Sequence, residues 1–268
     1  MSTTYPVSKI WRSLPANLPS FLGTYITQSL KQRSVQNPVR VFFRADDIGV
    51  PGKQFTRLID IFARHKAPLC LAVVPVWLTP VRWSAILNIS RKTSSLWCWH
   101  QHGWRHKNYE KQLKKQEFGP SRPAADIKQD LVRGRQRLAS IMGPHLDPIF
   151  TPPWNRCSAD TLNLLKQLDY HAVSRSIGAM PRVPKGLCDI PVHIDLHTRR
   201  DTDSNEGWQK LFLELGNALT GDICGIMIHH QRMNDAAFHF MDALLNVLSQ
   251  SDQCRLVRMT DLVQEIKS

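Results

Sequence analysis

The chain has 268 residues, of which 42% are hydrophobic and 21% charged. These proportions are typical of globular proteins and exclude a disordered or fibrous architecture. No stretch approaches the roughly 18 uninterrupted apolar residues of a membrane-spanning helix, so we expect no transmembrane segment. The 35 lysines and arginines exceed the 22 acidic residues, which leaves a formal net charge of +13. This charge favours polyanionic partners such as nucleic acid, anionic lipid surfaces or acidic glycans.

The six cysteines stand far apart in the sequence, and no two of them form a CxxC pair. A zinc ribbon needs closely spaced pairs, so these residues do not predict one. A chain of this length buries an adequate core without disulfides, and we therefore expect reduced thiols. Residues Met1 to Arg12 lack the basic stretch, long apolar run and small-residue cleavage site of a secretory signal. Both observations predict a cytoplasmic protein.

Short runs of β-branched and aromatic residues alternate with amphipathic segments, a pattern typical of repeated βα units. Strands are expected in the runs that begin near Val39, Ala67, Ser95, Asp147, His171, Cys188, Ile223 and Cys254. Roughly seven or eight such units predict an α/β fold, and a (β/α) barrel, regular or distorted, in preference to an open sheet. Residues 38–268 are expected to form this single domain. Residues 1–37 are expected to form an N-terminal extension that packs on it.

Helices are expected at residues 55–65, 125–142 and 158–168 and after Asp235. In the first of them, Leu58, Ile61 and Phe62 share one face. Ser158 is predicted to cap the third helix and Asp235 the last. The segment FLGTYITQSL in the N-terminal extension predicts a helix that closes the bottom of the barrel. A membrane-surface contact is the less favoured interpretation of this segment, because its apolar face is short and has few flanking basic residues.

Polar residues follow four of the predicted strands. In (β/α) barrels the carboxyl ends of the strands form the rim of the active site, so these residues are expected to converge. They are Arg44-Ala45-Asp46-Asp47, His100 to His106, Thr151 to Asn155, and His229-His230.

Asp47, His102 and His106 are candidate metal ligands. Two adjacent aspartates after an apolar strand cannot both be buried without partners, because desolvating an unpaired charge costs several kcal/mol. A bound cation would compensate one of them; a helix-capping turn is the alternative. His102 and His106 are four residues apart, and Gly103 permits a turn that lets both imidazoles face one point. Two imidazoles and a carboxylate suit a catalytic zinc-like ion with one position left to water, and a loop of unrelated histidines is the alternative.

His229 and His230 follow an apolar strand. Because strand side chains alternate, only one of the two can point into the mouth of the barrel. Opposite a metal site, that histidine would donate a proton. Otherwise it is a core histidine that is hydrogen-bonded to the backbone.

In their order along the chain, these motifs resemble those of the polysaccharide deacetylases of the NodB-homology group, carbohydrate esterase family 4. Arg44-Ala45-Asp46-Asp47 resembles the Thr-Phe-Asp-Asp motif of that family, and His102 to His106 its HxxxH-spaced motif. Residues 151–155 resemble its Arg-x-Pro-aromatic-Gly motif, and residues 226–229 its closing motif. The resemblance covers residues 39–233 and implies the distorted (β/α) barrel of seven or eight strands of the NodB-homology type.

The resemblance implies a role for each matched residue. Asp46 would be the catalytic base, and His229 the acid that protonates the leaving amine. Asp47, His102 and His106 would hold one divalent metal ion, zinc in the first place, with cobalt, manganese or nickel as alternatives. The expected substrate-binding residues are Trp104, Pro153, Trp154, Asn155 and Asp195.

Two matched positions depart from the family pattern. Thr151 stands where the family has an Arg that orients the base, and Asn155 replaces a Gly. Arg44 or Arg156 is a candidate source of the missing guanidinium. No clear fourth motif is present, and Asp195 is the best remaining carboxylate for it. The chain is therefore expected to be a divergent member of the group.

The sequence thus predicts a metal-dependent hydrolase that removes an N-acetyl or similar acyl group from an amino sugar of a glycan or glycan precursor. Basic residues follow the histidine motif, which suits an anionic acceptor, with a solvated loop as the alternative. In the absence of an export signal, the expected substrate is a cytoplasmic glycan precursor or a lipid-linked sugar, with peripheral contact to a membrane allowed.

Other functions stay open at this point. One is a non-enzymatic polyanion-binding protein, although Arg133, Arg135 and Arg137 make no continuous basic stripe and no specific nucleic-acid motif is present. Another is a degenerate deacetylase fold that keeps its metal without turnover. A third is a hydrolase of a non-sugar amide or formamide.

Overall fold

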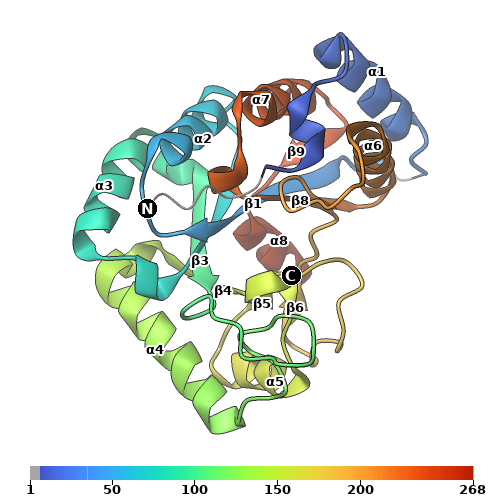
Figure 1. Ribbon diagram of the computed structural model, residues 1–268. Coiled ribbons are helices and arrows are strands. Elements are labelled where there is room, and N and C mark those ends of the chain that lie inside the picture. The colour runs from blue at the N-terminus through green and yellow to red at the C-terminus, as the bar shows by residue number, and fades with distance from the viewer. Residues whose placement is uncertain (1–6, 35, 268) are drawn as a thin grey trace. The chain divides into compact units, whose positions relative to one another are not determined.

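The structure is a computed structural model that describes residues 7–34 and 36–267 (Figure 1). It divides into two compact units, each assembled from separate stretches of the chain. The described residues of the first unit lie within Met1–Ala45, Gly52–Leu69 and His193–Val257, and those of the second within Asp46–Pro51, Cys70–Val192 and Arg258–Ser268. The boundary crosses β1 (Val39–Ile48) after Ala45, so Asp46 and Asp47 belong to the second unit.

The first unit contains a parallel sheet. In it, β1 pairs with β8 (Ile223–Ile228) and β9 (Cys254–Leu256), and β8 pairs with β7 (Ile194–Asp195). β1 is buried along nearly its whole length, as expected of a parallel strand with apolar residues on both faces. The longer helices of this unit are α1 (Leu18–Lys31), α2 (Lys53–Arg64), α6 (Ser204–Thr220) and α7 (Asp235–Ser249).

The second unit contains the remaining strands. Their order is β6 (Cys188–Asp189), β5 (Ala172–Val173), β4 (Leu146–Thr151), β3 (Trp97–His102) and β2 (Leu69–Val73). β3, β4, β5 and β6 pair in parallel, so their carboxyl ends meet at one edge, where His102 lies opposite Thr151. The helices of this unit are α3 (Pro80–Ser90), α4 (Ala124–Met142), α5 (Ala159–Gln167) and α8 (Met259–Lys267). Parallel strands that alternate with helices confirm the predicted α/β class.

The predicted helices form where the apolar stripes indicate. In α2, the predicted stripe of Leu58, Ile61 and Phe62 is buried. In α5, the side chain of Ser158 accepts a hydrogen bond from the Thr161 N–H at 3.2 Å, which confirms the predicted cap.

The predicted cap of α7 is wrong by one residue. Asn234, not Asp235, accepts a hydrogen bond from the Ala237 N–H at 3.0 Å, and Asp235 is the first helical residue. Asn and Asp are both good capping residues. Asn234 takes the role because it lies three positions before Ala237, whose N–H needs an acceptor.

The run that begins at Cys188 was expected to form one strand but forms two. β6 pairs with β5 in the second unit, whereas β7 pairs with β8 in the first unit. Pro191 lies between them and has no N–H to donate to a ladder, so regular pairing ends there.

The segment FLGTYITQSL forms most of α1, which confirms the predicted helix. Within the first unit it packs on α6: the Tyr25 hydroxyl donates to the Phe212 carbonyl, and the Phe21 and Phe212 rings meet edge to face at 4.8 Å. Upstream, the Trp11 indole N–H donates to the Leu196 carbonyl at 2.9 Å. None of the helices in the described residues is both long enough and apolar enough to cross a bilayer.

Candidate metal centre

Asp47, His102 and His106 lie together in the second unit. The Nε2 atoms of His102 and His106 lie 3.3 and 3.2 Å from the same Asp47 oxygen, Oδ1. One potential ligand atom from each of the three residues falls within 4.8 Å of the others. Two imidazole nitrogens and a carboxylate oxygen at this spacing suit a zinc-class divalent cation.

The hydrogen bonding of His102 leaves its Nε2 available for a metal. The Nδ1 atom lies 2.9 Å from the Thr151 carbonyl oxygen. A carbonyl can only accept, so Nδ1 carries a proton, and once the ring is neutral its lone pair lies on Nε2, the atom that faces Asp47. A backbone carbonyl that fixes the tautomer in this way is a regular feature of metal-binding histidines.

His106 reaches the same point because the chain turns sharply after β3. Gly103 has φ +60° and His106 has φ +55°, both in the left-handed region. A Cβ atom on Gly103 would lie 2.3 Å from a Glu117 oxygen and 2.6 Å from Pro153 Cγ, so only glycine fits there. The turn that Gly103 was predicted to permit is therefore present, and it requires a glycine at this position.

Glu117 organises the turn, although no sequence motif marks it as a functional residue. Its buried carboxylate accepts hydrogen bonds from three successive backbone N–H groups, those of Trp104 at 3.2 Å, Arg105 at 2.6 Å and His106 at 3.1 Å. Burial raises the pKa of Glu117, and these three bonds oppose the rise. Glu117 therefore fixes the backbone that carries His106, from a position eleven residues downstream.

The two histidines differ in their pKa values. Burial disfavours the charged form of His102, but its bond to Asp47 and the charges of Asp46 and Asp47 outweigh burial and raise its pKa. Burial dominates at His106 and lowers its pKa to about 4, against the attraction of Asp47. Asp46 is itself buried, at 3% exposure.

Two of the predicted substrate residues lie beside the candidate metal ligands or the turn between them. The Trp154 ring is 4.5 Å from the His106 ring, and Trp154 has a left-handed φ of +58°. Pro153 borders the Gly103 turn, and Asn155, also left-handed, follows Trp154. Trp104 instead packs against the core cluster that contains Phe118.

The residue at the position of the family's orienting Arg is Thr151, and its side chain belongs to the buried core. Thr151 is fully buried, and its hydroxyl lies 2.9 Å from Nε2 of His100. Of the two candidate replacements, Arg156 donates to the Lys115 carbonyl at 3.5 Å. Arg44 is fully buried in the first unit, where it donates to the Met227 sulfur at 3.0 Å.

His229 and Asp195 belong to the first unit. Asp195 caps the turn after β7, where its Oδ1 accepts from the backbone N–H groups of His197 at 3.0 Å and Thr198 at 2.9 Å. The His229 N–H donates to Nδ1 of His197 at 3.2 Å. Next to it, His230 is buried edge-on against Phe55, with ring centroids 5.8 Å apart. His230 thus has the features of a core histidine, whereas His229 is half-buried.

His197 is a second residue that the sequence did not single out. It is fully buried, and its Nδ1 accepts the His229 N–H, so the neutral ring carries its proton on Nε2. Burial, together with the charges of His229, His230 and Arg232, keeps its pKa well below the usual value. The neutral His197 imidazole therefore accepts the backbone hydrogen bond of His229, the predicted acid.

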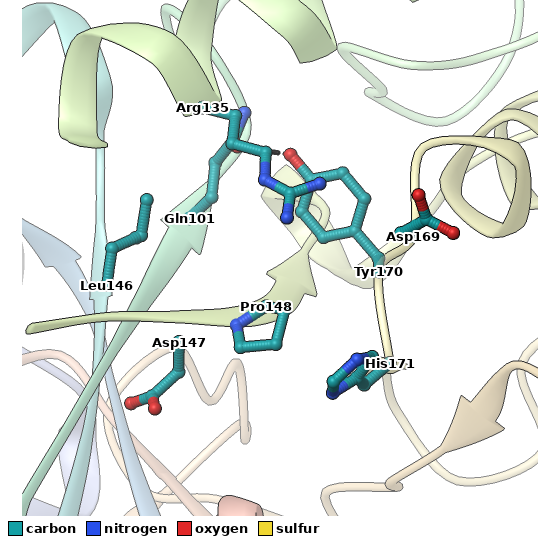
Figure 2. A pocket seen from close by; sticks show the side chains of 8 residues that line it. All are labelled: Gln101, Arg135, Leu146, Asp147, Pro148, Asp169, Tyr170 and His171. Carbon is teal, nitrogen blue, oxygen red and sulfur yellow. Dashed lines mark hydrogen bonds between the residues drawn. The ribbon is translucent and has the colours of Figure 1, made fainter. Parts of the chain in front are cut away.

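A cavity of about 290 Å³ in the second unit is lined by residues at the beginning of β4 and just before β5, together with Gln101 of β3 and Arg135 of α4 (Figure 2). The Tyr170 hydroxyl donates to Gln101 across it, and the Arg135 guanidinium lies 5.0 Å from the Tyr170 ring. None of its lining residues belongs to the metal cluster. The cluster is therefore separate from this cavity.

The family model described as polysaccharide deacetylase matches residues 39–173, which is half of the chain. That region includes Asp46, Asp47, His102, His106 and the segment around Trp154. The chain has no match among curated proteins.

Several solved structures share the fold. A protein from Pseudomonas aeruginosa PAO1 assigned to the polysaccharide deacetylases superimposes with a TM-score of 0.63 at 13% identity, over 84% of this chain and 90% of that one. A peptidoglycan deacetylase from Bacillus subtilis gives a TM-score of 0.53 at 13% identity, over 87% and 92% of the two chains. A family 4 pseudoenzyme from Bacillus anthracis gives 0.54 at 10% identity, over 85% and 66%. At these identities the similarity establishes the fold, and it confirms the predicted distorted barrel of this type.

Proposed function

The chain belongs to the polysaccharide deacetylase family, and on this premise we propose that it is a metal-dependent hydrolase. The proposed reaction removes an N-acetyl or similar acyl group from an amino sugar of a glycan or glycan precursor. The observation that carries the proposal is the convergence of Asp47, His102 and His106 on one point at the end of β1 and β3. Their donor atoms fit a zinc-class ion.

Such an ion, when bound, supplies a Lewis acid for the amide carbonyl and lowers the pKa of water at the site. In our proposal Asp47, His102 and His106 hold it. The Thr151 carbonyl keeps His102 in the tautomer that can bind, and Glu117 keeps His106 in place.

Asp46 is the proposed base, which takes the proton of the attacking water. It adjoins Asp47 in the sequence and lies close enough to His102 to raise the pKa of that ring. His229, at the end of β8, is the proposed acid that protonates the departing nitrogen. General acid–base steps of this kind typically contribute a hundredfold or more to the rate.

Trp154 is the proposed platform for the sugar ring, because aromatic faces suit the apolar face of a sugar and this ring stands 4.5 Å from that of His106. We place the reaction in the cytoplasm, which the six free cysteines support, since disulfides are rare in that compartment. The proposed substrate is accordingly a glycan precursor, including a sugar carried on a lipid.

The first test is the metal content of the protein after reconstitution with zinc, together with acetate or formate release from acylated amino sugars. We expect about one ion per chain, lost in His102→Ala and His106→Ala. Asp46→Asn should keep the ion while its kcat falls by at least about a hundredfold. His171→Ala is the matched control, because His171 is an exposed histidine of the same unit.

Two outcomes would contradict the proposal. One is a reconstituted native protein without metal, and the other is an Asp46→Asn variant that keeps most of its rate. A fold that holds metal without turnover is the second candidate function. Thr151 in place of the family's Arg favours it, and it predicts a normal metal content with no acid released from any sugar.

A further inference from the structure

The rim loop, residues 103–123, connects β3 to α4 and carries six basic and two acidic residues. Both acids turn inward. Glu117 accepts the three N–H groups described above, and Glu110 is 4% exposed and accepts from Ser121. Among the bases, Arg122 also turns inward, where it pairs with Asp130 at 2.6 Å. Both carboxylates of the loop are therefore buried in its interior and do not face the solvent.

The outer face of the rim loop is consequently all cationic. Its exposed charged residues are Arg105, Lys107, Lys111, Lys114 and Lys115. None of these five pairs with an acid anywhere in the described part of the chain. At its tip, Leu113 is 55% exposed between the lysines.

The β5–β6 loop, residues 174–187, repeats this combination. Ile177 is 58% exposed and Met180 71%, with Arg182 and Lys185 exposed nearby. No acidic residue occurs in the loop.

Buried contacts hold the β5–β6 loop in shape. The fully buried Arg175 donates to the Pro181 carbonyl at 2.9 Å and pairs with Asp189. The Ile177 N–H donates to the Val192 carbonyl at 2.8 Å. The apolar side chains at the tip are thus presented outward by a braced backbone.

Both loops leave the same edge of the sheet. β3, β4 and β5 run parallel, so their carboxyl ends, from which the two loops depart, lie on one side. The metal cluster lies on this side as well, because His102 ends β3. Exposed apolar side chains surrounded by unpaired cations at one edge match the headgroup region of an anionic bilayer. A soluble polyanion would bind the cations but would not bury the apolar side chains of Leu113, Ile177 and Met180.

We propose that the rim loop and the β5–β6 loop together form a surface that docks on bilayers containing anionic phospholipid. The lysines attract the headgroups, and the three apolar side chains enter the interface. Docked in this way, the edge that carries the metal cluster faces the membrane, so an amino sugar linked to a lipid anchor would be presented to it. The docking surface stands independently of whether the site is active.

The test is co-sedimentation with vesicles of phosphatidylcholine, with and without phosphatidylglycerol. The wild-type protein should bind only the vesicles that contain phosphatidylglycerol, and less so as salt rises. Two triple variants remove the surface: one carries Lys111→Gln, Lys114→Gln and Lys115→Gln, the other Leu113→Ser, Ile177→Ser and Met180→Ser. Each should weaken partitioning at least about tenfold. Val81→Ser is the control, because Val81 is 81% exposed in the same unit but outside both loops.

Metal content and hydrolysis of a neutral, soluble acylated sugar are measured on the same samples. We expect both to be equal in all variants, so a failure of docking and a failure of the proposed chemistry are separable. The proposal is overturned if the wild-type protein does not bind vesicles with phosphatidylglycerol. It is also overturned if the apolar triple variant binds as well as the wild type, since the surface would then recognise soluble polyanions by charge alone.

Discussion

Glu117 and His106 are joined by a hydrogen bond of 3.1 Å from the backbone N–H of the histidine to the carboxylate. The bond does not touch the imidazole, yet it decides where the imidazole stands, because His106 is held at φ +55°. A residue in the left-handed region needs support from its surroundings. Glu117 supplies that support, with the neighbouring N–H groups of Trp104 and Arg105 bound to the same carboxylate.

Glu117→Gln is therefore expected to weaken zinc binding by about tenfold to a hundredfold. An amide keeps one acceptor oxygen, but its NH₂ group faces backbone N–H donors. Glu110→Gln is the matched control: Glu110 is a buried glutamate of the same loop that bonds Ser121 and no residue of the turn that carries His106. Competition with a chromogenic chelator measures both affinities, and equal losses in the two variants would show that Glu117 acts only on general stability.

Gly103→Ala is expected to lower the free energy of unfolding of the apoprotein by about 3 kcal/mol. The alanine would have to keep φ near +60°, and its Cβ would collide with Glu117 and Pro153. Gly178→Ala separates the cost of the left-handed backbone from the cost of the collision, because Gly178 has φ +70° but nothing within 4 Å of a Cβ atom. It should cost only about 1 kcal/mol in urea denaturation. Similar losses for both variants would mean that the collision at Gly103 is relieved at no cost.

Zinc binding at about pH 6.5 is expected to release between about half a proton and one proton per ion, and that proton should come from His102. Because the pKa of His102 is raised, a larger fraction of its rings is protonated than of a free histidine at the same pH, and the metal must displace that proton. His106, with a pKa of about 4, is already neutral. Apparent affinity should thus fall as the pH falls through the pKa of His102. Calorimetry in buffers of different ionisation enthalpy gives the count, and two protons per zinc at this pH would refute the assignment.

Trp154→Ala is expected to raise KM for the acylated sugar about tenfold while metal content stays at the wild-type level. The ring stands beside His106, so its loss removes a wall of the site but no ligand atom. Steady-state kinetics and elemental analysis on one preparation check this. A KM equal to that of the wild type would remove Trp154 from the substrate site.

The sequence was sufficient to single out the candidate metal ligands because the required chemistry is visible in residue types. The sequence shows two adjacent aspartates at the end of an apolar run and two histidines four residues apart. These patterns point to Asp47, His102 and His106, and no knowledge of packing is needed to see them. The strands were equally accessible, since buried parallel strands are continuous apolar runs. Local sequence was less informative where two adjacent residues could fill the same role. At the start of α7, both Asn234 and Asp235 can cap a helix, and Asn234 does so instead of the expected Asp235. It also missed the break at Pro191, because β6 pairs with the strand before it and β7 with the strand after it, and this choice of partners is made only in the folded sheet.

By itself, then, the sequence determined which residues are candidate cation ligands and at which strand ends they lie, because ligand chemistry and strand periodicity are local properties. Only the tertiary structure decided how those residues are held and what the loops present to the outside. Glu117 gives no local signal, since one acid in a basic segment usually faces solvent. It becomes a support for His106 because the rim loop folds back on itself, and the same fold turns Glu110 inward and leaves the lysines outside. Hydrogen bonds between residues distant in sequence exist only once the chain has closed the loop between them.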